Sequence, residues 1–487
     1  MSSARFLSLV SSRRSAPRLA RNAVRAMATA PRGDYATLNE DDMKHFASIL
    51  APTSILSSLP PFNHPQSDLD SYNNDWMDKY HGRSKLVLKP KTTAEVSKIM
   101  KHCYNRKLAV VPQGGNTGLV GSGVPANDEV IISLANMSNV RSFDAMTGIL
   151  VADAGCVLEN LSNHVAAHSH IIPLDLGAKG SCHIGGNIST NAGGLRVIRY
   201  GSLHGSVLGL EVVLPNGEIL DQLSVMRTLG IVTAVSIHCP PAPRAQQNLV
   251  LALPSYDKLP EVFKLAKTHL SEVLSAFELF DREAYDLVSH HTGSRGLGED
   301  AGNSDCFVLI ETSGGRGEHD EEKLSTLLET LYETTDSSNP LIDSGVLSQS
   351  ADQFASLWSL REGIAEAAGK TGKVYKYDIS VPVREFMNVT NAVRKRLQDK
   401  GLYKAGNLHI NVVADAYTPE IEAVLEPFIF EVVQSHRGSI SAEHGLGLQK
   451  TQHLHYSKGQ ISRDWMRRIK LLFDDKGIMN PGKVVAV

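Results

Sequence analysis

Short apolar runs alternate with amphipathic stretches along residues 85–217. The apolar runs predict buried strands at residues 85–90, 108–112, 130–133, 148–152 and 210–214. Between the first two, a helix is expected to begin near Thr92–Thr93, with Glu95 in its first turn. Val96, Ile99 and Met100 then lie on one face of that helix. The alternation of strands with helices and glycine-rich loops predicts a mixed α/β unit.

A second unit is expected to begin after the proline cluster at residues 240–243. Helical patterns cover residues 259–271 and 321–333, and strand-like apolar runs cover residues 306–310 and 408–413. This pattern predicts a sheet backed by helices, which is an α+β domain. A short helix is expected near the C-terminus, at residues 465–473.

Composition limits the classes of partner. The chain has 487 residues, which favours two or three structural units, and its 49 basic and 52 acidic side chains nearly cancel. No basic field would attract nucleic acid, so a small molecule is the expected partner. The five cysteines lack a CxxC pair and are expected to be small buried apolar residues. No uninterrupted apolar run of about 18 residues follows the N-terminal region, so we expect no integral membrane segment.

The first residues have a different chemistry from the rest of the chain. Six arginines lie between Met1 and Pro31, among repeated serines and alanines, and no acidic residue precedes Asp34. This composition is typical of a mitochondrial transit peptide, which we assign to residues 1–32, and it predicts a location in the mitochondrial matrix. A disordered basic tail is the alternative.

Two long glycine-rich segments, residues 112–118 and 173–194, are the strongest local signal. Glycine allows backbone amides to approach and converge on phosphate oxygens, so the pair predicts a site for a pyrophosphate. Tight turns without a ligand are the alternative. A nicotinamide site would need G-x-G-x-x-G between a strand and a helix, with an acidic residue about 20 positions later, and neither segment has that spacing.

Two short motifs in the second half carry chemical side chains: Asn407-Leu-His409-Ile-Asn411 and Ala442-Glu443-His444-Gly445. In an extended strand His409 and Asn411 share a face, whereas the adjacent Glu443 and His444 are expected to point in different directions. An imidazole and a carboxylate suit a divalent metal such as zinc. A histidine satisfied in the core or at the surface is the alternative for each.

These segments together resemble a known flavoprotein family. PQGGNTG, the run from Pro173 through NAGGLRVIRYGSLHG, and LGLEVVLPNGEILD are similar to the FAD-binding domain of the vanillyl-alcohol-oxidase type, in its branch of D-2-hydroxyglutarate dehydrogenases. The similarity continues through SAFEL, LWSLREGIAEA, VYKYDIS, NLHIN and SAEHGLG. It implies an α+β fold: a two-subdomain FAD-binding domain, an α+β substrate (cap) domain with an antiparallel sheet, and a C-terminal helical segment. The implied boundaries are an N-terminal segment at 33–84, the FAD-binding domain at 85–242, the cap at 243–434, and a C-terminal segment at 435–487 that returns to the flavin site.

The resemblance also implies a site. It makes His409 and Glu443 ligands of a divalent metal, with zinc expected, and it makes His444 the catalytic base. Arg361, Lys376, Asn411 and His444 would bind substrate. Residues expected to bind noncovalent FAD are Pro112, Gln113, Gly114, Gly115, Asn116, Thr117, Gly118, Leu176, Gly177, Gly180, Ser181, Gly185, Gly186, Asn187, Thr190, Asn191, Gly193, Gly194, Gly230 and Ile231. The implied reaction oxidises D-2-hydroxyglutarate to 2-oxoglutarate by hydride transfer to the flavin, and electrons pass to electron-transfer flavoprotein. The oligomeric state stays open, with a homodimer as one option.

Three departures from the family pattern are visible. An F-I-G-S-E-G-type segment is expected before T-L-G-I, but Ser224–Arg227 runs directly into Thr228. A G-Y-G-H-x-G-D-G-N-L-H motif is expected around His409, yet the first histidine is absent and no His, Asp or Glu lies between Lys400 and His409. Ala365 stands where relatives have a threonine. Two further hypotheses therefore remain: a D-lactate-type flavin dehydrogenase, and a catalytically impaired flavoprotein scaffold.

Overall fold

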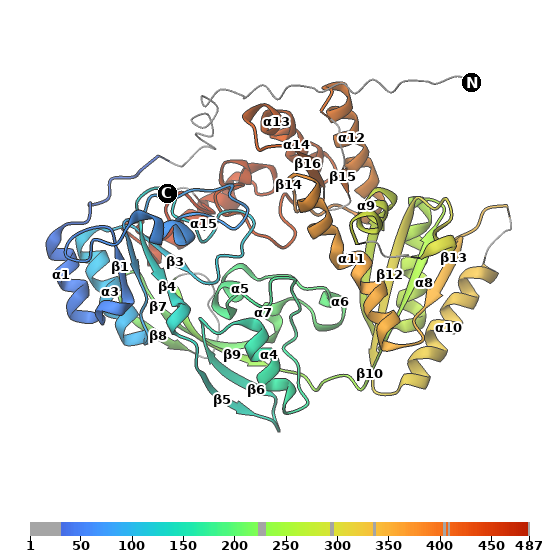
Figure 1. Ribbon diagram of the computed structural model, residues 1–487, viewed down its shortest axis with the longest axis horizontal. Helices are drawn as coiled ribbons and strands as arrows, with labels where there is room; N and C mark the ends of the chain where they lie inside the picture. Colours follow the sequence, from blue (N-terminus) through green and yellow to red (C-terminus); the bar gives the residue numbers. More distant parts are fainter. Residues whose placement is uncertain are drawn as a thin grey trace, which may run out of the picture.

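The N-terminal lobe contains two sheets that share one apolar core (Figure 1). The structure is a computed structural model that describes residues 31–222, 230–292, 297–334, 338–402, 406–407 and 410–485. The first sheet has the order β1-β2-β4-β3, with β2, β4 and β3 parallel. The second has the order β5-β6-β9-β7-β8 and is antiparallel. The strands are β1 (Ile55–Ser57), β2 (Leu86–Leu88), β3 (Val110–Gln113), β4 (Val130–Ser133), β5 (Val140–Asp144), β6 (Ile149–Asp153), β7 (Val207–Val213), β8 (Ile219–Gln222) and β9 (Ile231–His238).

The helices of this lobe begin where the sequence predicts capping. Thr92 and Glu95 form a reciprocal capping box at the start of α3, and Val96, Ile99 and Met100 are buried, as predicted. The strand predicted at residues 130–133 is confirmed as β4, and the other predicted strands of the lobe are confirmed with shifted ends. The helices are α1 (Glu40–Ile49), α2 (Asp70–Asn73), α3 (Thr93–Arg106), α4 (Leu158–Ala166), α5 (Ile184–Thr190), α6 (Val197–Tyr200) and α7 (Leu203–Ser206).

The second lobe is an antiparallel sheet covered by helices on both faces, with strand order β11-β12-β10-β13. Alternate residues of β10 face opposite sides: Leu249 and Leu251 pack in the core with α8 and α10, and Val250 packs in the core with α9 and α11. The elements are β10 (Ala245–Leu253), α8 (Leu259–Leu270), β11 (Leu274–Asp281), α9 (Arg282–Thr292), β12 (Cys306–Gly314), α10 (Gly317–Glu333), β13 (Ser344–Leu347) and α11 (Ala351–Thr371).

A fourth, small sheet follows α11, with the antiparallel order β14-β16-β15. The expectation of a single sheet in the second unit is wrong, because the runs predicted at 306–310 and 408–413 contribute to different sheets, β12 and β16. The physical reason is that Val412 and Ala414 pack in a separate core with α12 and α14. The elements are β14 (Lys373–Lys376), α12 (Phe386–Asp399), β15 (Gly406–Asn407), β16 (Asn411–Ala414), α13 (Pro419–Leu425) and α14 (Phe428–Ser435).

The chain then returns to the N-terminal lobe, as Figure 1 shows for the red segment around α15 (Gln460–Phe473). The Val110 N–H donates to the Ile478 carbonyl (2.8 Å), and the Asn480 N–H donates to the Val110 carbonyl (2.9 Å). The Lys483 ammonium donates to the Ser122 carbonyl (2.8 Å). The last residues described therefore hold β3 and the first glycine-rich loop.

Three predictions from composition concern the whole chain. All five cysteines are free and buried, which confirms the expected environment. Across the described ranges, none of the helices combines the length and apolarity needed to cross a bilayer. Residues 1–30 of the predicted transit peptide lie outside the described residues, and Arg32 forms an ion pair with Asp128 (2.7 Å).

Candidate functional site

The two glycine-rich segments meet in the structure. A Cβ added to Gly115 would lie 1.9 Å from the Ser181 carbonyl oxygen, and one added to Gly114 would lie 3.3 Å from His183 Cβ. Only a residue without a side chain permits the contact at Gly115, because the obstacle is backbone. The side-chain amide of Gln113 donates to the carbonyls of Tyr72 (2.9 Å) and Gly123 (2.8 Å), which holds the first loop closed.

The surroundings of α5 fit a bound dinucleotide. Gly185 packs so closely that an added Cβ would lie 2.6 Å from Ala154 Cβ, whereas one added to Gly186 would meet nothing within 4 Å. Two buried atoms, His183 Nδ1 and Asn187 Oδ1, have no hydrogen-bond partner among the described residues. Buried polar atoms normally find partners, so these two are available to a ligand's polar groups. Burial also lowers the pKa of His183, which favours a neutral imidazole.

Some of the predicted cofactor residues make contacts within the protein. Ile231 is buried in the core of the N-terminal lobe, and an added Cβ on Gly230 would lie 2.3 Å from the Val213 carbonyl oxygen. The Thr190 hydroxyl donates to the Gly186 carbonyl (3.1 Å), and Asn191 Oδ1 accepts from the His204 N–H (3.0 Å). The remaining predicted residues lie in or next to the loops: Pro112, Asn116, Thr117, Gly118, Leu176, Gly177, Gly180, Gly193 and Gly194.

Residues 443–448 lie between the two loops and join them to the rest of the site. A Cβ added to Gly193, in the second glycine-rich segment, would lie 2.1 Å from Glu443 Oε2. At the other end, the Leu448 N–H donates to the carbonyl of Val120, which follows the first loop (2.8 Å). The structure therefore brings the segment containing Glu443 and His444 into contact with the second glycine-rich segment and with the residues that follow the first.

Asp378 determines the shape of that segment. Its buried carboxylate accepts from the N–H groups of Ala442 (3.0 Å), Glu443 (3.0 Å) and His444 (2.8 Å), and from the Ser441 hydroxyl (2.9 Å). Burial works to raise the pKa of Asp378, but the charges of His444 and Lys450 and the amide hydrogen bonds outweigh it and lower the pKa.

The expectation that Glu443 and His444 point in different directions is wrong. Their side chains converge, with 3.5 Å between His444 Nε2 and Glu443 Oε1. The reason is that consecutive amides curl around one carboxylate, so the backbone is not an extended strand with alternating side chains.

Arg361 lies on α11, and its Nε donates to Glu278 Oε2 on β11 (2.8 Å). Burial raises the pKa of Glu278, the Arg361 guanidinium opposes that shift, and the charge of Glu443 adds to it. Arg361, Glu278 and Glu443 therefore form one group of interacting charges. Ala365, one turn later on α11, is exposed.

Lys376 and Asn411 face each other as register partners on β14 and β16. The Lys376 ammonium lies 5.3 Å from the centre of the Trp76 ring, and it makes no ion pair with any residue that the structure describes. Burial lowers the pKa of Lys376. A partly buried ammonium without a carboxylate partner is costly unless an anionic ligand neutralises it.

A cluster of possible metal ligands lies at the segment containing Glu443 and His444. One carboxylate oxygen each from Asp378 and Glu443 and one imidazole nitrogen of His444 lie within 4.8 Å of one another. The Asp378 carboxylate already accepts hydrogen bonds from four donors, so the carboxylate of this cluster best placed for a metal is that of Glu443. His409 lies outside the described residues, as do 223–229 and 403–405, where the family pattern is interrupted.

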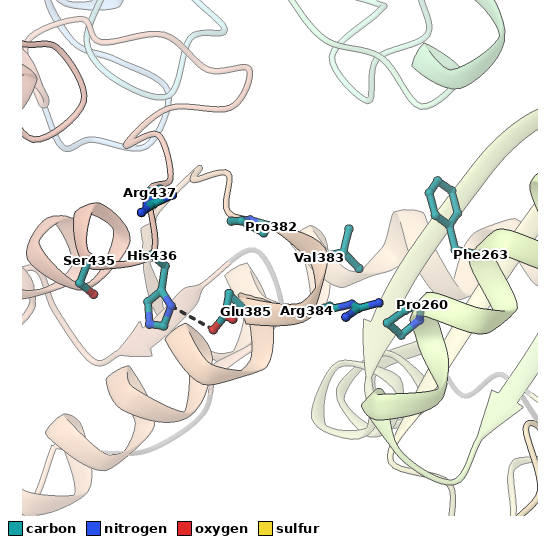
Figure 2. A pocket seen from close by; sticks show the side chains of 9 residues that line it. All are labelled: Pro260, Phe263, Pro382, Val383, Arg384, Glu385, Ser435, His436 and Arg437. Carbon is teal, nitrogen blue, oxygen red and sulfur yellow. Dashed lines mark ion pairs between the residues drawn. The ribbon is translucent and has the colours of Figure 1, made fainter.

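A surface cavity lies away from these groups. It has a volume of about 560 Å³, and Figure 2 shows it between α8 and the segments around Val383 and His436. Its lining includes an ion pair between His436 and Glu385 (3.0 Å), marked by the dashed line in Figure 2. None of the predicted site residues lines it, so its size alone does not make it the site of the predicted chemistry.

Sequence reasoning missed several charged residues that shape the site: Asp378, Glu278, Arg196 and Glu311. Three of them lie within or beside quoted motifs, in VYKYDIS, SAFEL and NAGGLR. Those motifs were a usable signal, but the partners of these charges are far away in the sequence. Their roles become visible only when the lobes are assembled.

Comparisons with known proteins agree with this architecture. Residues 84–222 match the model of an FAD binding domain, and residues 242–484 match that of the C-terminal domain of FAD linked oxidases. The chain is 45% identical to the mitochondrial D-2-hydroxyglutarate dehydrogenase of Arabidopsis thaliana, over 93% of this chain and 82% of that protein. This chain belongs to the FAD-linked oxidase family that includes the D-2-hydroxyglutarate dehydrogenases.

A second relative and a solved structure are also similar to this FAD-linked oxidase. The D-2-hydroxyglutarate–pyruvate transhydrogenase of Saccharomyces cerevisiae is 41% identical, over 93% of this chain and 96% of that protein. The solved structure of p-cresol methylhydroxylase with substrate bound superimposes with a TM-score of 0.73 at 15% identity, over 92% of this chain and 98% of that chain. That neighbour confirms the fold predicted from the resemblance, the α+β fold of the vanillyl-alcohol-oxidase type.

The contact between the glycine-rich loops leads to a first test. Replacing Gly115→Ala places a methyl group against the Ser181 carbonyl, so the loops must separate. We expect roughly 10-fold weaker FAD binding, because overpacking of this kind costs about 1–3 kcal/mol. The measurement is titration of apoprotein with FAD. Gly205→Ala is the matched control, since its added Cβ meets nothing within 4 Å. Equal FAD affinity of the two variants would contradict the assignment.

Proposed function

We propose that this protein oxidises D-2-hydroxyglutarate to 2-oxoglutarate with FAD. The observation that carries the proposal is the contact of the segment containing Glu443 and His444 with the second glycine-rich segment, which itself packs against the first. The charge of Glu443 also acts on Glu278, the partner of Arg361. The relatives named D-2-hydroxyglutarate dehydrogenases, at 45% and 43% identity, support the choice of substrate. A 2-hydroxy acid with two carboxylates also matches a site with two cations.

Each residue of the proposed site has its own role in the reaction. Arg361 and Lys376 neutralise the two carboxylates, Arg361 held in place by Glu278 and Lys376 by its strand and the ring of Trp76. Asn411 contributes an amide beside Lys376. The His444 imidazole takes the proton of the 2-hydroxyl, and the amide contacts of Asp378 keep that imidazole in position. The chemistry that FAD supplies when bound is acceptance of the hydride from C2.

The cofactor would be held mainly by backbone. The contacts at Gly115 and Gly185 create the close backbone approach that a pyrophosphate needs, and His183 and Asn187 offer buried polar atoms. We propose noncovalent binding. The structural contacts of Gln113, Thr190 and Asn191 keep the loops in shape for it.

We propose in addition a divalent metal, zinc by its donor preferences, bound by Glu443 and His409. Such an ion would lower the pKa of the substrate hydroxyl. Zinc sites in enzymes usually have three protein ligands, and this chain lacks one family histidine, so the proposal depends on His409 lying near Glu443.

The electron acceptor and the compartment are proposed from the family resemblance and from the N-terminal composition. We propose that electron-transfer flavoprotein reoxidises the enzyme, as in the family, and that the enzyme acts in the mitochondrial matrix. The arginine-rich residues 1–32 and the word mitochondrial in the names of relatives support the compartment. The transhydrogenase of Saccharomyces cerevisiae makes pyruvate an alternative acceptor to test. A homodimer is the proposed assembly.

The role of His444 can be isolated kinetically. With His444→Ala we expect FAD to stay bound while anaerobic reduction of the flavin by D-2-hydroxyglutarate slows by roughly 100-fold or more, because acid–base assistance is lost. Stopped-flow absorbance measures the rate. His455→Ala replaces an exposed histidine of the same segment and serves as the control. Reduction of the His444 variant at the rate of the unaltered protein would reject the assignment.

Lys376 should determine preference for a dicarboxylate. Lys376→Met is expected to lower kcat/KM for D-2-hydroxyglutarate by roughly 10- to 100-fold, since a hydrogen bond to a charged group contributes about 1.5–3 kcal/mol. D-lactate, which has one carboxylate, should lose less. Lys373→Met changes an exposed lysine at the start of the same strand and should leave the ratio of the two substrates unaltered. Equal losses for both substrates would contradict the proposed role.

The metal proposal is tested by removing the ion. Dialysis against a chelator is expected to slow flavin reduction by roughly 10-fold or more, and added zinc should restore it. Glu443→Gln should be slow with or without zinc, while Glu420→Gln, at an exposed position on α13, should respond like the unaltered protein. Full activity after chelation, with no metal detected by mass spectrometry, would exclude a metal.

A further inference from the structure

Arg196 joins the two lobes at a position beside the proposed site. Its Nε and Nη2 donate to the two carboxylate oxygens of Glu311 on β12, at 2.7 and 2.9 Å. Its Nη1 donates to Asp175, which lies in the second glycine-rich segment. Arg196 itself lies two residues after the end of that segment, so one guanidinium connects both ends of the second glycine-rich segment to the second lobe.

Glu311 is built into the second lobe as a fixed acceptor. Its side chain is 0% exposed, and it also accepts from Trp358 Nε1 (2.8 Å) and from the Ser313 hydroxyl (3.2 Å). An ion pair with two charge-assisted hydrogen bonds has a defined geometry, and a buried carboxylate is strongly destabilising when its partner is removed. The pair therefore holds a specific relative placement of the two lobes.

Residues adjacent to the contact between Arg196 and Glu311 connect it to Arg361 and Glu443. Trp358 precedes Arg361 by one turn of α11, so the bond to Glu311 also fixes the helix that carries Arg361. Gly193, three residues before Arg196, lies against Glu443. Arg199 on α6 donates to the Glu272 carbonyl (2.6 Å), and Figure 1 shows α6 on the side of the N-terminal lobe that faces the second lobe.

We propose that Arg196 is a positioning residue: its contact with Glu311 aligns the second glycine-rich segment, which contacts Glu443, with Arg361 in the second lobe. The inference rests on the proposed function for its kinetic consequence. Arg196 does not itself contact substrate in this account. It determines the distance and angle between the flavin loop and the substrate groups, on which a hydride transfer depends steeply.

The test compares Arg196→Gln with Arg141→Gln. Arg141 has the same pattern of partners, with Nε on Asp153 (2.7 Å) and Nη2 on Glu211 (2.9 Å), but all three residues lie within the N-terminal lobe. In Arg196→Gln we expect the limiting rate of anaerobic flavin reduction to fall by roughly 10- to 100-fold. The affinities for FAD and for D-2-hydroxyglutarate should change by less than about threefold in the same variant, because no binding contact is removed. Arg141→Gln should keep the limiting rate.

Two further variants distinguish alignment from a loss of folding. Glu311→Gln should slow reduction to a similar degree, and the double variant should be no slower than either single one, because the two residues act as a unit. Arg196→Lys keeps the charge but lacks the two-pronged geometry, so it should recover only part of the rate. A limiting rate in Arg196→Gln equal to that of the unaltered protein, or an equal slowing in Arg141→Gln, would overturn the proposal.

A readout on the protein alone separates this proposal from the proposed function. Hydrogen exchange of residues 191–200 and 306–314 should be faster in Arg196→Gln and unaltered in Arg141→Gln. If the unaltered protein is not reduced by D-2-hydroxyglutarate, the proposed function fails, while faster exchange at both segments still supports the alignment of the lobes. Unaltered exchange at both segments would overturn the alignment itself.

Discussion

The carboxylate of Asp378 maintains the backbone turn on which the candidate site depends. Burying a carboxylate is unfavourable unless hydrogen bonds and nearby positive charge compensate, and here three consecutive amides, a hydroxyl and Lys450 provide that compensation. Because the same amides belong to residues 442–444, satisfying the carboxylate also curls the chain and brings Glu443 and His444 together. The chemistry proposed for this protein therefore depends on a group that takes no part in the reaction.

The turn at residues 442–444 contributes to the site because of the contacts that surround it. Gly193 contacts Glu443 on one side, Val120 binds Leu448 on the other, and Arg196 binds Glu311 between the lobes. The first contact is made by the second glycine-rich segment itself, and Val120 and Arg196 each lie two residues beyond a glycine-rich segment. The flavin loops, the substrate cations and the proposed base are thus parts of one connected structure. At Gly115, the close approach of the Ser181 backbone explains why only glycine fits that position.

Local patterns predicted local structure well. The capping residues Thr92 and Glu95 and the apolar face of Val96 and Ile99 were sufficient for α3, and the run at residues 130–133 for β4. The roles of Asp378, Glu278 and Glu311 could not be predicted in this way, because their partners are 83 residues away for Glu278 and 115 for Glu311. The convergence of Glu443 and His444 was missed for the same reason, since a distant carboxylate replaces the alternation of a strand. The split of the second unit into two sheets depended on which helices cover β16, and that too is tertiary information.

The central claim is that the joined loops hold a flavin within reach of a 2-hydroxy dicarboxylate. The most direct measurement is the absorbance spectrum of the purified protein near 450 nm, recorded without oxygen before and after addition of D-2-hydroxyglutarate. We expect a flavin band that bleaches with D-2-hydroxyglutarate and bleaches more slowly with D-lactate. A colourless protein that does not take up added FAD, or a flavin band that no 2-hydroxy acid bleaches, would contradict it.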